Sequence, residues 1–103
     1  MIHVLATIEI AAGQRSAFLT EFRKIIAAVR EEEGCIEYGP AVDADTDIGA
    51  QNPLGADTVM VIEKWESVDA LKAHSVAPHM LEYREKVKDL VKGMTLRILE
   101  PAG

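Results

Sequence analysis

The sequence has few of the features that mark secreted, membrane or nucleic-acid-binding proteins. Cys35 is the one cysteine, so no disulfide can form within the chain and nothing indicates an oxidising compartment. No apolar run approaches the roughly 20 residues that span a bilayer, and the first residues lack the charged region and cleavage site of a signal peptide. The 11 basic and 17 acidic residues give a net charge of -6, which opposes binding to phosphate backbones. We therefore expect a cytoplasmic protein that binds neither membranes nor nucleic acid.

The chain also lacks an internal linker. No stretch rich in proline, glycine or serine divides its 103 residues, so we expect one domain over residues 1–103. Apolar residues make up 49% of the sequence, which is enough for a continuous core and argues against global disorder.

The first half of the sequence predicts two strands separated by a helix. Apolar residues alternate from Ile2 to Ile10, which indicates a strand. From about Gln14 to Glu33 they recur at spacings of three and four, which predicts one amphipathic helix stopped by Gly34. Residues 35–42 then form a strand that Gly39-Pro40 restricts to a sheet edge or a bulge, and a long acidic loop covers residues 43–57.

The second half repeats the pattern with different lengths. Thr58 to Trp65 is apolar on both sides, as expected of a central strand, and Ser67 can cap a helix that runs to about His74. Pro78 starts a second helical segment with Gly93 near its end, followed by a short strand over residues 95–99. The apolar stripe of that segment is expected to comprise Met80, Tyr83, Val87, Leu90 and Met94. The order is β-α-β-β-α-β, an α+β ferredoxin-like fold.

Such a sheet carries helices on one face only, and its other face must meet water or a partner. The second side of the first strand includes Leu5 and Thr7, which is too apolar for water. Packing two sheets face to face buries both and gives a dimeric α+β barrel with a two-fold axis. We therefore expect a homodimer.

Three local strings together resemble the antibiotic biosynthesis monooxygenase (ABM) family of small dimeric α+β barrels. They are Glu33-Gly34-Cys35-Ile36-Glu37-Tyr38, Glu63-Lys64-Trp65-Glu66-Ser67, and Ala70-Leu71-Lys72-Ala73-His74 through Pro78-His79. The resemblance implies a pocket between helices and sheet. It also implies oxidation of a quinol, phenol or polycyclic aromatic substrate by O2, without a metal or flavin cofactor. The protein would supply positioning, desolvation and a proton acceptor.

Two residues are the main candidates for this chemistry. His74 is the candidate base, because an imidazole titrates near neutral pH and its helix should overhang Trp65. A helix-ending histidine bonded to backbone is the competing interpretation. Trp65 offers a broad apolar face for stacking on an aromatic substrate, and core packing is its alternative.

Weaker candidates for substrate binding are Tyr83, Tyr38 and Arg84. Tyr83 lies on an apolar helical stripe, where core packing is the alternative to reaching the ligand. We assign His79 a structural role. Cys35 has no evident base beside it and is expected to be an inert thiol.

The sequence argues against a metal site. Asp43-Ala44-Asp45-Thr46-Asp47 begins like a calcium-binding loop, but Ile48 replaces the required glycine and Leu54 the required glutamate. His74 and His79 are five residues apart, which does not place them on one helical face. We expect no bound metal.

At some positions the sequence differs from the residues that better-defined branches of the same superfamily carry, and these differences leave other functions open. A heme-degrading branch of the superfamily resembles the chain at Trp65 and His74, but Ala6 stands where that branch carries an asparagine. Val61 and Leu71 stand where anthrone-oxidising members place polar groups. The alternatives are a non-catalytic small-molecule binding or stress-response module, a heme-binding relative and a cofactor-free isomerase.

Overall fold

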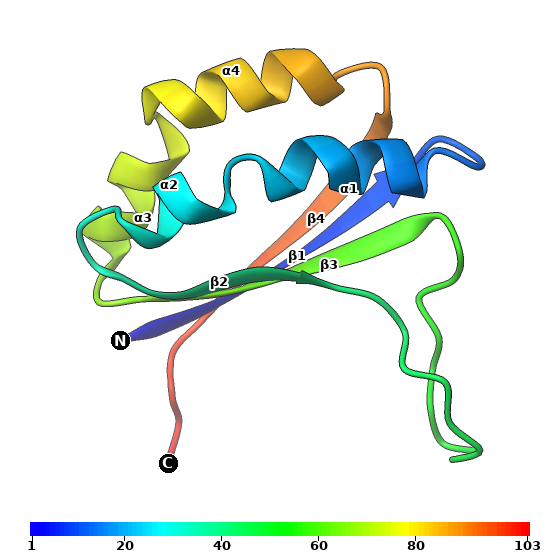
Figure 1. Ribbon diagram of the computed structural model, residues 1–103. Helices are drawn as coiled ribbons and strands as arrows, with labels where there is room; N and C mark the ends of the chain where they lie inside the picture. The colour runs from blue at the N-terminus through cyan, green and yellow to red at the C-terminus, as the bar shows by residue number, and fades with distance from the viewer.

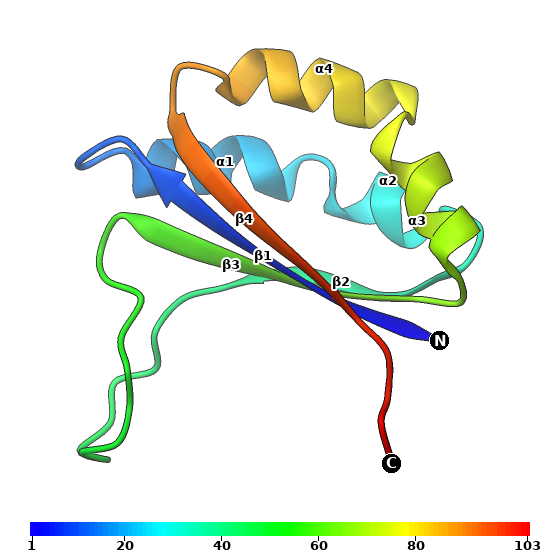
Figure 2. The ribbon, with the colours of Figure 1, turned by 180° about the vertical axis from the view of Figure 1, so that it is seen from behind.

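The computed structural model describes residues 1–103 and has the predicted order of elements, with the first predicted helix divided in two and the two predicted helical segments of the second half present as α3 and α4 (Figure 1). The elements are β1 (Ile2–Ile10), α1 (Arg15–Arg23), α2 (Ile26–Arg30), β2 (Cys35–Ala41), β3 (Thr58–Trp65), α3 (Val68–Ser75), α4 (Pro78–Val87) and β4 (Val91–Leu99). The four strands form one antiparallel sheet in the order β2-β3-β1-β4, and all four helices cover the same face of it (Figures 1 and 2). The predicted α+β ferredoxin-like fold is confirmed.

The core lies between the sheet and the helices and follows the alternation of β1 and β3. Every second residue of β1 from Ile2 to Ile10 is buried, and Val59, Val61 and Trp65 are buried on the same side of β3. The helices contribute three aromatic rings, with Phe18 and Phe22 of α1 stacked at 5.9 Å between centroids and Phe22 meeting Tyr83 of α4 edge-on at 5.9 Å. These contacts bury the apolar stripes that the helical spacing predicted.

The prediction of one continuous helix from about Gln14 to Glu33 is wrong, because the structure has two shorter helices in this segment. The helical segment breaks after Arg23, where the amides of Lys24 and Ile25 bond to carbonyls three residues back, and it ends at Arg30. The two adjacent β-branched residues Ile25 and Ile26 lie at this break, and β-branched side chains have reduced helix propensity. The apolar stripe nevertheless continues through the break, because Ile25 and Val29 are both buried.

The boundary between the last helix and strand is also corrected. The structure ends α4 at Val87 and begins β4 at Val91, so the predicted strand of residues 95–99 is too short. Met94, expected on the helical stripe, instead pairs with Ile8 across the sheet, and Gly93 pairs with Glu9. The last step of the stripe, four residues from Leu90 to Met94, keeps both residues on one side of either a helix or a strand, so spacing does not distinguish the two here. Pairing with β1 satisfies backbone groups of residues 91–99.

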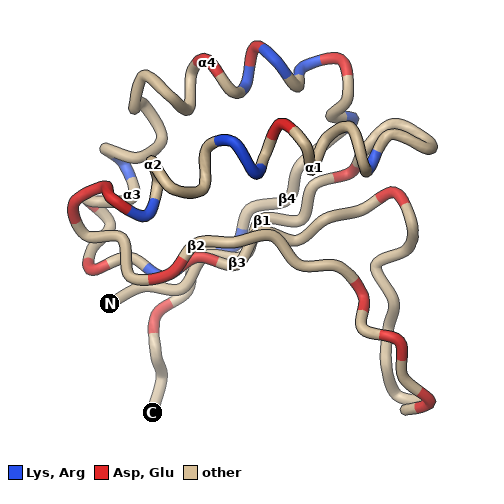
Figure 3. The backbone as a smooth tube through the Cα atoms, viewed as in Figure 1, with Lys and Arg blue, Asp and Glu red and all other residues tan.

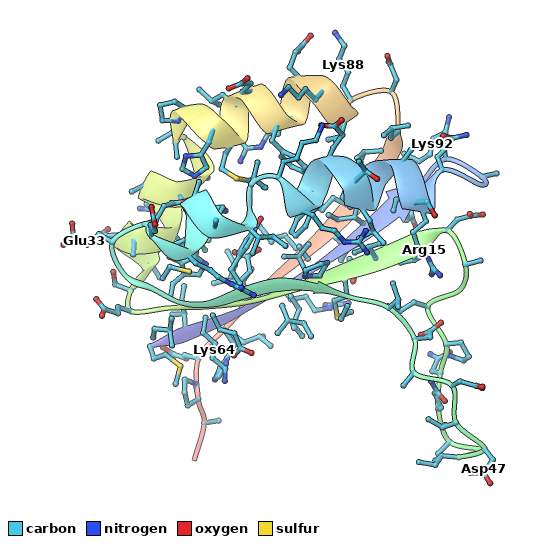
Figure 4. The ribbon with its side chains drawn as sticks, in the orientation of Figure 1. Arg15, Glu33, Asp47, Lys64, Lys88 and Lys92 are labelled. Atoms are coloured by element: carbon cyan, nitrogen blue, oxygen red, sulfur yellow. The ribbon has the colours of Figure 1, made fainter.

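The other face of the sheet carries no helix. The loop of residues 43–57 and the C-terminal tail both extend beyond this face, at opposite ends of it (Figures 1 and 2). Acidic residues mark the loop (Figure 3), and Asp47 lies at its far end (Figure 4). No helix is long and apolar enough to cross a membrane.

Gly34 explains why the first and third motif strings occur together. Its φ of +84° is a conformation that favours glycine, and a Cβ built on it would lie 2.6 Å from the Cβ of Ala70 in α3. Its carbonyl also accepts a hydrogen bond from the Glu66 amide at 2.8 Å. The turn after α2 is therefore held directly against the start of α3, which brings the residues before Gly34 close to the side chains of α3.

Candidate functional site

A largely apolar cavity of about 410 Å³ lies between the sheet and the helices. This volume falls within the range of about 300 to 1,000 Å³ typical of small-molecule sites. Val4, Ala6 and Val61 contribute its sheet wall, and Met94 and Leu96 of the edge strand β4 line it as well. Its polar groups are few, and four of them come from different elements: Tyr38 of β2, Glu63 of β3, His74 of α3 and Tyr83 of α4.

Glu63 is a buried carboxyl group on the helix-covered face of the sheet. It is 6% exposed, and its Oε1 accepts a hydrogen bond from Trp65 Nε1 at 2.9 Å. Burial raises the pKa of Glu63 above its ordinary value, although the bond from Trp65 and the neighbouring His74 work in the opposite direction. A carboxyl with a raised pKa inside a mostly apolar cavity is suited to accept or donate a proton.

His74 is 5% exposed and is held on three sides. Its ring centroid lies 4.7 Å from that of Trp65 and 5.4 Å from that of Tyr38. Its Nδ1 lies 2.9 Å from Glu32 Oε2. The alternative of a helix-ending histidine bonded to backbone does not hold, because the partner of His74 is a carboxylate 42 residues away in sequence.

Tyr38 and Tyr83 bring two phenol groups to the cavity. Tyr38 stacks on Phe22 at 5.5 Å, and Tyr83 meets Phe18 edge-on at 6.3 Å, so both rings belong to the core as well as to the cavity wall. Burial raises the pKa of both hydroxyl groups well above the ordinary value for tyrosine. Both therefore remain neutral hydrogen-bond donors at physiological pH.

Four polar atoms of the site have no partner within the protein. Neither tyrosine hydroxyl, nor Glu63 Oε2, nor His74 Nε2 is among the hydrogen-bonded atoms, yet the structure has no fully buried side-chain nitrogen or oxygen without a partner. These atoms therefore retain accessible surface. All four residues line the cavity, so a ligand inside it would lie next to side chains that carry unpaired polar atoms.

Trp65 does not reach the cavity surface, where stacking on a substrate would require it to be. It is completely buried and is absent from the residues that line the cavity. Its indole instead contacts the His74 ring on one side and donates its N–H to Glu63. The structure thus brings Trp65 together with His74 as expected, but beneath the two polar groups and not on the cavity surface.

Arg84 and Cys35 are placed at the margins of the site. Arg84 lines the cavity and donates a hydrogen bond to the Ser75 carbonyl at 2.6 Å, which links α4 to the end of α3. Cys35 does not line the cavity. Burial and the carboxylates of Glu32 and Glu63 raise the pKa of its thiol, so the thiol is not activated as a nucleophile.

The two histidines that sequence spacing had separated converge in space. His79 lies in the first turn of α4 and its Nε2 is 2.8 Å from Glu32 Oε2, the oxygen that also contacts His74. They do not share a helical face, as the spacing predicts, and they meet because α3 and α4 place them on either side of Glu32. No group of three or more His, Cys, Asp or Glu side chains has an arrangement that could hold a metal ion.

Sequence reasoning missed Glu63 and Glu32. Glu63 could have been found, because it occupies the inward position between Val61 and Trp65 in the two-residue period of β3. Glu32 lies in the run Glu31-Glu32-Glu33, which is typical of a solvated surface, and nothing local distinguishes it from its neighbours.

Comparison with known proteins assigns the chain to a family. Residues 1–86 match the antibiotic biosynthesis monooxygenase family. The chain belongs to this ABM family. It is 43% identical over 103 residues to a protein of Escherichia coli K12 named "Probable quinol monooxygenase YgiN", and the match covers 98% of each chain.

Solved structures of similar fold include Rv0793 from Mycobacterium tuberculosis, with a TM-score of 0.80 and 26% identity over 99% of this chain and 95% of that one. PA3566 from Pseudomonas aeruginosa has the same TM-score at 24% identity, covering 99% of this chain and 94% of that one. The fold of this ABM protein is therefore shared with solved structures over nearly its full length.

Ala6, Val61 and Leu71, the three positions compared with other branches in the sequence analysis, all line the cavity. Their small or aliphatic side chains add only apolar surface to it.

Replacing Glu63 by glutamine should change how stability depends on pH. The folded state holds the Glu63 proton more tightly than the unfolded chain does, so ionisation of this group destabilises the folded protein as pH rises above about 4. We expect the stability of Glu63→Gln relative to the wild type to increase with pH and then level off above the raised pKa. Urea unfolding at a fixed protein concentration, repeated at a series of pH values, measures the free energy of unfolding of both proteins.

The control is Glu66→Gln, which changes an exposed carboxyl group directly after β3. A stability difference that does not vary with pH would contradict the assignment.

Proposed function

We propose that this protein is a monooxygenase that oxidises a small quinol or related phenol with O2, without a cofactor, in the cavity between sheet and helices. The observation that carries the proposal is the pair of buried acid-base groups, His74 and Glu63, which line a largely apolar cavity and each carry a polar atom without a protein partner. The name of the Escherichia coli relative supports a quinol as the substrate class.

The proposed reaction begins with a proton transfer. His74 Nε2 accepts a proton from one hydroxyl group of the quinol, since this nitrogen makes no hydrogen bond within the protein. The resulting anion transfers one electron to O2, and the ring radical and superoxide combine at a ring carbon to form a peroxide anion. The His74 imidazolium returns its proton to this anion, which gives a hydroperoxide and restores the neutral imidazole. Loss of water leaves a new carbonyl group, so one quinol and one O2 give one hydroxyquinone and one water.

The surroundings favour the charge-separated steps in different ways. The apolar walls exclude water from the anion, which favours its oxidation over reprotonation by solvent. The neutral hydroxyl groups of Tyr38 and Tyr83 are available to donate hydrogen bonds to the substrate oxygens. The free oxygen of Glu63 can exchange the proton that leaves with the water. In this scheme Trp65 is a positioning residue, because it contacts His74 and Glu63 but not the cavity.

Oxygen uptake with a panel of menadiol-type quinols tests the proposal. Protein treated with a chelator and shown by absorbance to be free of flavin and heme should consume O2 in a saturable manner, faster than the quinols oxidise alone. With ¹⁸O₂, one labelled atom should enter the product. The absence of a rate above background across the panel would reject the proposal. Conversion of substrate without O2 would instead indicate an isomerase that uses the same acid-base groups.

The proposal includes a homodimer formed through the uncovered face of the sheet. Leu5 and Ile62 are paired across β1 and β3 at the centre of this face, and Met60 lies beside them on the same side. Ile62 is 38% exposed. The acidic loop and the C-terminal tail extend past this face at its two ends, as arms around a second copy would (Figures 1 and 2).

A further inference from the structure

Glu32 is the one carboxylate in the protein that contacts two imidazoles. Its Oε2 lies 2.9 Å from His74 Nδ1 and 2.8 Å from His79 Nε2. The three side chains come from the turn after α2, from α3 and from α4, so the cluster joins three segments. The Glu32 side chain is 14% exposed and that of His74 is 6% exposed, whereas that of His79 is 30% exposed and lies on the outer side.

The shared contact with Glu32 Oε2 determines which ring nitrogen of each histidine carries a hydrogen. An ionised carboxylate only accepts hydrogen bonds, so each imidazole nitrogen that contacts it must carry a hydrogen. A neutral His74 therefore carries its hydrogen on Nδ1, and its lone pair is on Nε2. Nε2 is the atom that has no protein partner and remains accessible, on a residue that lines the cavity.

We propose that Glu32 is the positioning residue of the site: it holds His74 in the Nδ1–H form, aims Nε2 at the cavity, and stabilises the imidazolium that forms when Nε2 accepts the substrate proton. This inference rests on the proposed function, in which His74 is the base. A buried carboxylate bonded to Nδ1–H of a catalytic imidazole performs these tasks by fixing the tautomer and by its charge. The second hydrogen bond, from His79, fixes the carboxylate itself.

No other group around His74 makes a hydrogen bond that could orient its ring in place of Glu32. Tyr38 and Trp65 present ring faces or edges to the imidazole, and neither bonds to it. Glu63 lies close enough for its pKa to be lowered by His74, but its hydrogen bond is to Trp65. Arg84 is bonded to the Ser75 carbonyl. The hydrogen bond to Glu32 is thus the only one that orients the His74 ring.

Glu32→Gln tests the inference because it preserves size and removes the charge. The matched control is Glu33→Gln, the same change at the next residue, whose exposed side chain points outward and makes no hydrogen bond or ion pair (Figure 4). With a quinol substrate we expect Glu32→Gln to lower kcat by about 10²-fold, with KM changed by less than about threefold. Glu32→Asp should restore part of kcat.

Long-range ¹H–¹⁵N NMR of the histidine rings gives a readout that does not require turnover. The wild type and Glu33→Gln should show neutral His74 protonated on Nδ1, and Glu32→Gln should show a mixture of tautomers. Wild-type His74 protonated on Nε2 would overturn the inference even if quinols are oxidised. Wild-type His74 protonated on Nδ1 without turnover of any quinol would reject the proposed function alone. Equal kinetics and equal tautomers in the two glutamine variants would show that Glu32 only connects segments of the fold.

Discussion

Replacing His74 by glutamine is expected to lower kcat for quinol oxidation by about 10²- to 10⁴-fold, the range typical for removal of a general base. The amide retains a donor that can bond to Glu32, so the contact between α3 and the turn after α2 can be kept while the proton acceptor is lost. Stopped-flow or electrode measurements of O2 consumption under saturating quinol, together with a thermal unfolding scan, separate loss of chemistry from loss of fold.

His3→Gln is the matched control for this variant. His3 lies on the side of β1 that faces away from the helices, opposite the buried residues Ile2 and Val4, and should leave kcat within about twofold of the wild type. A folded His74→Gln protein with kcat close to that of the wild type would remove His74 from the mechanism. Loss of activity in Glu63→Gln under the same conditions would then transfer the role of base to Glu63.

Introducing two carboxylates into the uncovered sheet face is expected to dissociate the proposed homodimer. Leu5 and Ile62 are direct cross-strand neighbours, so Leu5→Glu/Ile62→Glu places like charges side by side at the centre of the face. Burying these charges without partners costs several kcal/mol each, which should raise the dissociation constant by at least about 10³-fold. Light scattering after size exclusion should show an 11.3 kDa species for the variant and twice this mass for the wild type.

Leu81→Glu provides the control for the dimer experiment. Leu81 is 55% exposed on α4, on the opposite side of the molecule from the uncovered face, and the charge should leave the dimer intact. A wild-type protein that is a monodisperse monomer at low micromolar concentration would reject the dimer. Equal dissociation by both variants would show that the interface lies elsewhere.

The resemblance to the ABM family depended on strings that the structure shows to be in contact. Gly34 of the first string packs against Ala70 of the third, and Trp65 of the second packs against His74. These contacts require particular residue types, namely a glycine with positive φ and a flat ring beside an imidazole. Short motifs separated along the chain were therefore informative together, because they form one packed unit at the end of the sheet.

The period of the apolar residues determined the strands, the order of elements and the side of the sheet that each residue faces, because burial of one face imposes that period on the chain. Periodicity could not determine where the first helix breaks, or whether Met94 belongs to a helix or to β4, since these outcomes depend on pairing and packing with distant segments.

The sequence by itself also predicted that His74 lies close to Trp65. It did not reveal that Glu63 is buried beside the cavity and accepts a hydrogen bond from Trp65, or that Glu32 contacts two histidines 42 and 47 residues away. Only the tertiary structure decided these features. The ionisation, tautomer and direction of a side chain are set by neighbours from other elements, and those neighbours come together only when the chain is folded.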